Sequence, residues 1–105
     1  MGVVIRDGAD VHVIPIDRVD SVEAQDDDIA VHADAKTRLK EQMLSSLEGP
    51  LDPRRFVRIH HSYLLNPDRL ARRESVSRDA RMAILRDGRR LPASRTGCAR
   101  LHELL

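Results

Sequence analysis

The residues best suited to chemistry lie in one stretch, residues 56–66, which reads F-V-R-I-H-H-S-Y-L-L-N. Hydrogen-bonding side chains are interspersed with aliphatic ones there, and a Ser-Arg pair follows at positions 94 and 95. Because successive side chains of a strand point to opposite faces, such a strand buries one side and directs donors to the other. A row of donors suits a polyanion or the edges of bases better than a catalytic pocket. The pattern therefore favours nucleic-acid binding.

Charge is divided unevenly between the two halves of the chain. Residues 1–53 contain 5 Lys/Arg and 12 Asp/Glu, a net charge of −7. Residues 54–105 contain 13 Lys/Arg and 5 Asp/Glu, a net charge of +8, so the net charge of +1 is the sum of two opposite charges. All 13 cations of the second half are Arg, which is suited to bidentate contacts with phosphate and guanine. Such asymmetry indicates an electrostatic partner for the second half, although an Arg-rich composition with merely solvated charges gives the same count.

Catalytic and metal-dependent functions find little support in the sequence. It contains no Gly-rich phosphate loop, zinc-ligand spacing or nucleophile elbow. The single cysteine, Cys98, fits a reducing, cytoplasmic setting, and as a nucleophile it would need His60, His61 or His102 as a base. No apolar run approaches the roughly 20 residues of a membrane helix. We therefore expect a protein that is not an enzyme, needs no cofactor or metal, and does not associate with membranes.

Turn signals divide the chain into short elements. Asp7-Gly8 predicts a hairpin between residues 3–6 and 11–14, and Asp87-Gly88 predicts a second that leads into residues 89–91. Leu39, Met43 and Leu47 recur at four-residue spacing before Gly49-Pro50, which predicts a helix over residues 39–48. The remaining elements that we expect are a helical turn at 16–19, strands at 22–24, 29–32, 69–77 and 81–86, and a short helix at 97–105.

These elements predict a mainly β fold with a minor α component. Residues 1–105 are expected to form a single domain, large enough for one core but not for two. That core must be aliphatic, because Phe56 and Tyr63 are the only aromatic residues apart from the histidines. Many short strands, turns every 8–12 residues and one amphipathic helix complete the expected architecture.

Three segments in this order resemble the LytTR family, the DNA-binding output domains of many bacterial response regulators. Residues 56–66 are similar to the family's F-x-R-x-H-x-S-y-x-x-N segment, and residues 87–95 to its dG-x-x-lPvSR segment. Residues 16–24 match its I-x-x-I-x-x-i-e-A opening more weakly. The resemblance runs from about Ile16 to Leu105. It implies an elongated fold of short antiparallel sheets that reads DNA with loops in the major groove, and a role in two-component signalling.

The resemblance also implies three DNA-facing segments. They are the turn 25–28, the region around His61, and the stretch Ser94-Arg95-Thr96. Family members typically recognise paired direct repeats of double-stranded DNA, often as dimers formed by an attached receiver domain, and we expect a receiver or sensor domain to be missing from this chain. The acidic run Asp26-Asp27-Asp28 departs from the family pattern. Either this turn stands off the duplex, or Asp27 or Asp28 accepts a hydrogen bond from a cytosine amino group.

Single residues of the stretch 56–66 have separate expected roles. Arg58 is either a phosphate clamp, or a buttress of the DNA-facing loop, or a strand residue in an ordinary salt bridge. His60 is expected to be structural, whereas His61 is expected to meet DNA. Tyr63 is expected to belong to the core.

Further candidates for DNA contact follow from the side chains themselves. Ser62 and Asn66 could donate to phosphates, although Asn66 before Pro67 is equally explained as a turn former. Arg89 and Arg90 flank the second hairpin and are either backbone contacts or solvated charges. Arg95 is the strongest candidate, because a fork of donors can reach a guanine edge.

One rival function from another class stays open. The acidic and basic halves could serve a non-catalytic protein–protein interaction module, in which the acidic half docks a basic partner or copies pair head to tail. The dependence of binding on salt would separate this function from DNA binding.

Overall fold

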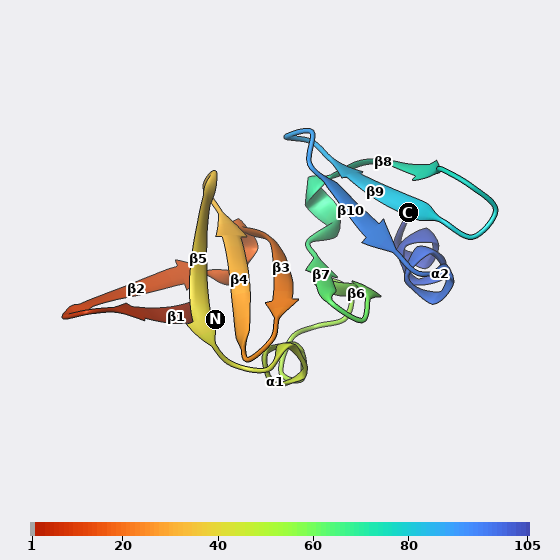
Figure 1. Ribbon diagram of the computed structural model, residues 1–105. Helices are drawn as coiled ribbons and strands as arrows, with labels where there is room; N and C mark the ends of the chain where they lie inside the picture. Colours follow the sequence, from red (N-terminus) through yellow and green to blue (C-terminus); the bar gives the residue numbers. More distant parts are fainter. Residues whose placement is uncertain (1) are drawn as a thin grey trace.

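The computed structural model describes residues 2–105, and it begins with a hairpin (Figure 1). Strands β1 (Gly2–Asp7) and β2 (Asp10–Pro15) pair antiparallel, with Asp7 opposite Asp10. The predicted hairpin is confirmed, but its turn is Gly8-Ala9 and lies one residue later than expected. Gly8 has a φ of 61°, a conformation that glycine adopts without steric cost. The predicted helical turn follows at Ile16–Arg18.

A five-stranded antiparallel sheet forms the middle of the molecule, in the order β5-β4-β3-β7-β6. Its strands are β3 (Val19–Gln25), β4 (Asp28–Ala33), β5 (Lys36–Glu41), β6 (Val57–His60) and β7 (Tyr63–Leu65). The continuous strand suggested by residues 56–66 is therefore a hairpin that turns at His61-Ser62. His61 consequently lies at a turn and not on a strand face.

The helix predicted over residues 39–48 is wrong in its first half. Residues 36–41 form the edge strand β5, and helix α1 covers only Leu44–Glu48. Pairing with β4 overrides the local periodicity, because the chain turns back at Asp34-Ala35, both with positive φ. Leu39 is 56% exposed and Met43 is 70% exposed, so their four-residue spacing marks no buried face.

The second half of the chain adds a three-stranded sheet and a helix. The sheet has the order β10-β9-β8, with β8 (Leu70–Ser75), β9 (Arg81–Leu85) and β10 (Arg90–Ala93). A short 3-10 helix, Pro67–Arg69, leads into it. The predicted hairpin at Asp87-Gly88 is confirmed, with Gly88 at a φ of 93°. Helix α2 (Arg95–Leu104) is also confirmed and begins two residues earlier than predicted.

The core consists of two hydrophobic clusters, where one was expected. The first gathers aliphatic side chains of β1 to β4 and α1 around Phe56, and the second joins β6 to the three-stranded sheet and α2. Strand β7 serves both, because Leu64 belongs to the first cluster and Leu65 to the second. Alternation along a strand allows this division. Tyr63 packs against the second cluster and is half-buried.

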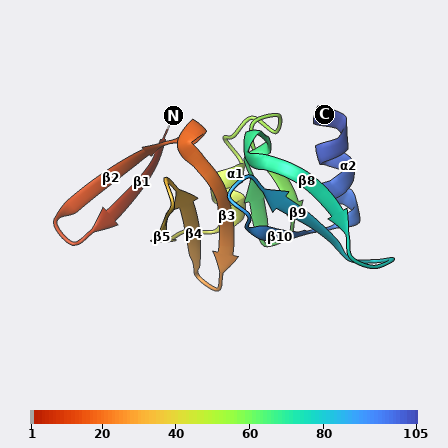
Figure 2. The same ribbon diagram turned by 90° about the horizontal axis from the view of Figure 1, so that it is seen from above.

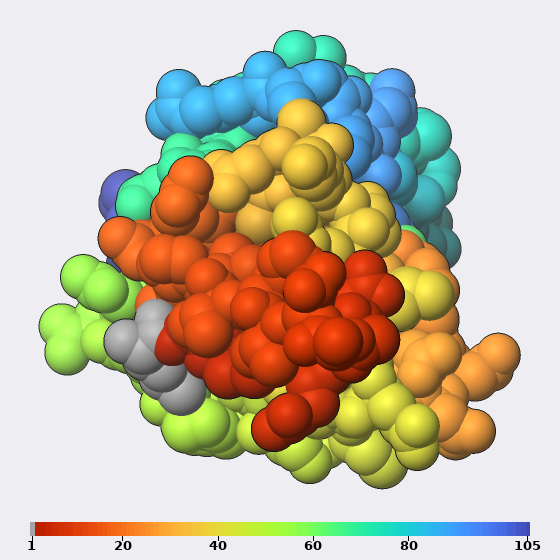
Figure 3. All heavy atoms as spheres, turned by 90° about the vertical axis from the view of Figure 1, so that its left-hand side faces the viewer, coloured from red at the N-terminus to blue at the C-terminus, as the bar shows by residue number. Residues whose placement is uncertain are grey.

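The molecule is elongated, with extents of 47 × 24 × 24 Å. Figure 2 shows the β1–β2 hairpin at one end and the three-stranded sheet with α2 at the other. The hairpin covers much of the face seen in Figure 3. The predicted mainly β, elongated fold is confirmed. Among residues 2–105, no helix is long and apolar enough to cross a bilayer.

Candidate nucleic-acid interface

The turn between β6 and β7 is held by the side chain of Arg58. Its Nε donates to the carbonyl oxygens of His60 and His61 at 3.0 and 3.1 Å, and Nη2 also donates to the His61 carbonyl. Nη1 donates to Glu48 Oε1 at 2.6 Å, which ties the turn to α1. The side chain of Arg58 is 20% exposed. Its guanidinium is thus directed to the protein, which fits a buttress or an ordinary salt bridge better than a phosphate clamp.

The two histidines at this turn differ in their surroundings. His60 Nδ1 accepts a hydrogen bond from the Ser62 backbone N–H at 3.1 Å, whereas the His61 ring is exposed. Burial, followed by the neighbouring His61 and Arg58, lowers the pKa of His60. A neutral His60 ring can keep accepting from Ser62, and His61 is left as the ring that a ligand can reach.

The lowered pKa of His60 gives a dependence of stability on pH. In the unfolded chain His60 takes up a proton near pH 6.5, before it does so in the folded protein. Its stabilising contribution is therefore complete above about pH 6.5 and is lost as the pH falls below that value. We expect a His60→Asn variant, whose amide oxygen can accept from Ser62, to lose less free energy of unfolding than the wild type between about pH 7.5 and 5.5. Urea denaturation at both pH values measures this.

The pKa of His32 is also lowered, by burial and then by Arg89, and this residue is present in both proteins. Its contribution therefore cancels in the comparison. Equal losses of stability in the wild type and in His60→Asn would contradict the structural role of the His60 ring.

The turn between β3 and β4 is fixed against the His61 turn. The Ala24 N–H donates to the Ser62 carbonyl at 2.8 Å. Gln25 pairs with Asp28, so Asp26 and Asp27 form the tip, and Asp26 has a φ of 53°. Asp26 and Asp27 are exposed, while Asp28 is half-buried at the start of β4. The carboxylate of Asp27 is consequently better placed for a ligand than that of Asp28.

The start of α2 is fixed against β6. The Ser94 N–H donates to the Ile59 carbonyl at 2.7 Å, and Ser94 Oγ accepts from the Gly97 N–H at 3.0 Å as the helix cap. A Cβ on Gly97 would lie 2.0 Å from the Ile59 carbonyl oxygen, so only glycine allows this approach. Arg95 and Thr96 occupy the first exposed turn of the helix.

These backbone hydrogen bonds link three segments into one rigid set, with the β6–β7 turn in the centre. In Figure 2, β3 runs down to its turn at the lower side of the view, and α2 rises from that side to the C-terminus. The structure therefore brings together Asp27, His61, Ser62, Arg95 and Thr96, with Ser94 as a cap and Arg58 as a support.

Three other residues that were predicted to contact DNA form hydrogen bonds or ion pairs with the protein itself. Asn66 is 4% exposed; its Nδ2 donates to the Val19 carbonyl, and its Oδ1 accepts from the Asp68 N–H, both at 3.0 Å. Arg89 pairs with Asp20 at 3.5 Å and with Asp87 at 2.9 Å. Arg90 pairs with Glu74 at 3.2 Å. The turn-former interpretation of Asn66 fits this geometry better than a phosphate contact.

Sequence reasoning missed the partners that hold the site. Asp20 accepts from Arg69 at 2.6 Å as well as pairing with Arg89, and so joins the two larger sheets. Asp20 and Arg69 are 49 positions apart, so no local pattern could reveal the pair. From the sequence, Gly97 is only the first residue of the predicted helix, because its close approach to Ile59 depends on the tertiary structure.

Comparison with known proteins identifies the fold and the family. The family model of the LytTr DNA-binding domain matches residues 9–105. Among solved structures, the chain is similar to a LytTr DNA-binding domain from a Bacillus cereus protein described as a methyl-accepting/DNA response regulator. The TM-score is 0.84 at 21% sequence identity, over 98% of this chain and 94% of that one. A search of curated proteins gave no match.

Proposed function

Because this chain belongs to the LytTR family of DNA-binding domains, we propose that it reads specific double-stranded DNA sequences by inserting loops into the major groove. It would do so as the output domain of a bacterial transcription regulator. The observation that carries the proposal is the rigid set of three exposed segments, joined by the hydrogen bonds from Ala24 to Ser62 and from Ser94 to Ile59. Because the segments are already held in place, less conformational entropy is lost when they bind DNA.

Each side chain of the set has a role that its surroundings support. Arg95 has no hydrogen bond or ion pair to residues 2–105, so its guanidinium is available for a guanine edge. His61 would donate to a phosphate or accept from a base, and the hydroxyls of Ser62 and Thr96 would donate to phosphates. Arg58 would act as a positioning residue through the carbonyl groups of the turn.

The acidic turn has a distinct role in this proposal. Carboxylates near phosphates are repelled by several tenths of a kcal/mol each, even when screened. An aspartate at this turn is favourable only if it meets a donor, and the cytosine amino group is the donor that the major groove offers. We assign this contact to Asp27, with Asp28 as the alternative.

The dimensions of the chain support the reading of more than one groove. The long axis of 47 Å exceeds the distance between successive major grooves, which is about 34–36 Å. We further propose that two copies occupy paired direct repeats as a dimer on DNA. An attached receiver or sensor domain would bring these copies together.

The direct test is selection from a randomised duplex pool at roughly 0.1 M salt, where counterion release still favours binding. We expect a short motif to be enriched, repeated about one helical turn apart. Retention without enrichment would leave a nonspecific basic surface and remove the base-reading roles. A chain that retains no DNA would contradict the proposal.

The dependence of the affinity on salt separates DNA binding from the rival protein–protein module. Binding through about four to six phosphates should give a log–log slope near −4 to −5. Titration of the enriched duplex at several salt concentrations measures the slope. A much shallower slope would favour the rival function.

A further inference from the structure

The arginines of the basic half fall into two groups according to their partners. Ion pairs engage Arg54, Arg58, Arg69, Arg72, Arg89 and Arg90. In the second group, the side chains form no hydrogen bond or ion pair to residues 2–105. Most members of this group lie around the β8–β9 hairpin and the start of α2, and these are Arg73, Arg78, Arg81 and Arg95. Arginines without an ion pair are therefore concentrated at one end of the molecule, where the tip of the hairpin also carries one exposed carboxylate, Asp79.

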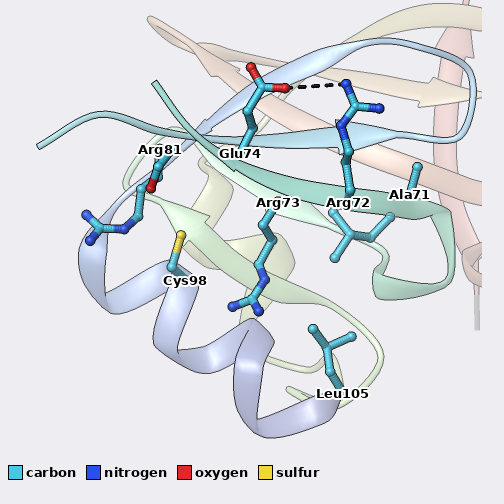
Figure 4. Close-up of a pocket in the computed structure, with 9 residues that line it drawn as sticks. Ala71, Arg72, Arg73, Glu74, Arg81, Cys98 and Leu105 are labelled. Carbon is cyan, nitrogen blue, oxygen red and sulfur yellow. Dashed lines mark hydrogen bonds and ion pairs between the residues drawn. The ribbon is translucent and has the colours of Figure 1, made fainter. Parts of the chain in front are cut away.

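The two faces of the three-stranded sheet show the same contrast. On the outer face, Glu74 neutralises Arg72 at 3.3 Å and Arg90 at 3.2 Å. Strand alternation places Arg73 on the opposite face, which is also that of Arg81. Figure 4 shows Arg73 directed toward α2, in a groove that Arg81 and Cys98 also line, while Glu74 and Arg72 meet on the other side of the strand. Within residues 2–105, no acidic side chain forms an ion pair with the arginines of this inner face.

The β8–β9 hairpin is adjacent to the third DNA-facing segment. Arg81 pairs in register with Ala93, the residue immediately before the helix cap Ser94. The connection between the strands, residues 76–80, is closed by hydrogen bonds from the Val76 and Ser77 N–H groups to the Ala80 carbonyl, at 2.9 and 3.3 Å. In Figure 2 this connection reaches the same lower side as the β3–β4 turn. Arg78, at the tip, is exposed.

We propose that the β8–β9 hairpin is a fourth DNA contact, which binds backbone phosphates beside the bases that Arg95 reads. Arg78 at the tip and Arg81 at the base supply the contacts, and Arg73 extends the positive charge along the groove. This inference rests on the proposed function and adds residues outside the three segments of the family resemblance. Phosphate contacts fix the register and orientation of a protein on the duplex without reading sequence. The hairpin would thus position Arg95 against its base.

The test compares an Arg78→Ala/Arg81→Ala double variant of the whole chain with the wild type, on the duplex enriched by selection. We expect affinity to fall by the same factor on the enriched motif and on its single-base variants, with a salt slope shallower by about 2. The matched control is Arg55→Ala, which removes an arginine whose side chain is also unpaired. Arg55 lines a hollow with Ile16 and Asp17, before the start of β3 and opposite the β3–β4 turn.

Shortening the duplex locates the contact. When the enriched duplex is shortened stepwise from either end, the wild type should lose affinity at one end, and the double variant should not respond there. Thermal unfolding checks that the double variant is folded; if it is not, the exposed Arg78→Ala alone takes its place.

Two failures are distinguishable. A wild-type chain that retains no DNA overturns the proposed function itself. A wild-type chain that binds DNA, while the double variant behaves as Arg55→Ala does, overturns the hairpin contact alone.

Discussion

Replacing Gly97 by alanine is expected to destabilise the protein, although the same change in most helices is stabilising. Alanine in a helix is favoured over glycine by about 1 kcal/mol. At Gly97, however, the new Cβ would lie 2.0 Å from the Ile59 carbonyl oxygen and 2.6 Å from the Ile59 Cα. Because both contacts are with backbone, α2 or β6 must move, and overpacking of this kind costs about 1–3 kcal/mol. Urea denaturation of Gly97→Ala measures the change.

The matched control is Ala99→Gly, the reverse exchange at an exposed position of the same helix. It reports the intrinsic preference of the helix for alanine and should cost about 1 kcal/mol. If Gly97→Ala were more stable than the wild type by a similar amount, the close approach of α2 to β6 would be wrong.

Gly97→Ala should also weaken DNA binding under conditions where the variant is folded. Moving α2 away from β6 displaces Arg95 from the other two segments, since hydrogen bonds from the Ser94 N–H to the Ile59 carbonyl and from Arg100 Nη1 to the Arg58 carbonyl fix the helix against β6. Stability and binding are therefore linked through the packing of α2 on β6.

Local signals in the sequence predict the parts of the fold whose geometry is local. Hairpins require particular residues at their turns, and Gly8 and Gly88, both with positive φ, mark two of them. Ser94 caps α2 through its own side chain, again within three residues. The expected β content, both of these hairpins and α2 could thus be derived from neighbouring residues.

The elements that were mispredicted depend on distant partners. Leu39 fits a helical repeat, but β4 supplies a strand partner that makes residues 36–41 an edge strand. Phe56 and Leu64 belong to one core while Val57 and Leu65 belong to another, a division that composition cannot express. Periodicity reports which residues share a face only when the element type is already known.

The candidate site shows the same limit. Motif spacing identified Arg58, His61 and Arg95, yet it could not state which arginines were available to a ligand. Arg58 is occupied by Glu48 and the turn carbonyls, while Arg95 is unpaired within residues 2–105. Whether an arginine is available to a ligand depends on its ion pairs, and the two residues of such a pair can lie far apart in the chain.

Arg95→Ala is the substitution from which we expect the largest loss of sequence-specific binding. A bidentate contact with guanine is worth about 1–3 kcal/mol, so Kd should rise roughly 5- to 150-fold on the enriched duplex. Discrimination should relax at one base pair and persist at the others. Because the Arg95 side chain has no partner among residues 2–105, thermal stability should not change. Affinities for a set of single-base variants of the duplex measure both effects.

Two control variants test whether Arg95→Ala acts through the loss of a base contact. Arg95→Lys keeps the charge but not the fork of donors, so it should keep the wild-type salt slope without recovering discrimination at that base pair. Arg55→Ala, on the opposite side of the molecule, should change Kd little although it removes the same charge. If Arg95→Ala instead weakened binding equally on every duplex, with a slope shallower by about 1, Arg95 would be a phosphate contact. Base reading by this domain would then depend on His61 and Asp27, whose side chains are exposed at the other two turns.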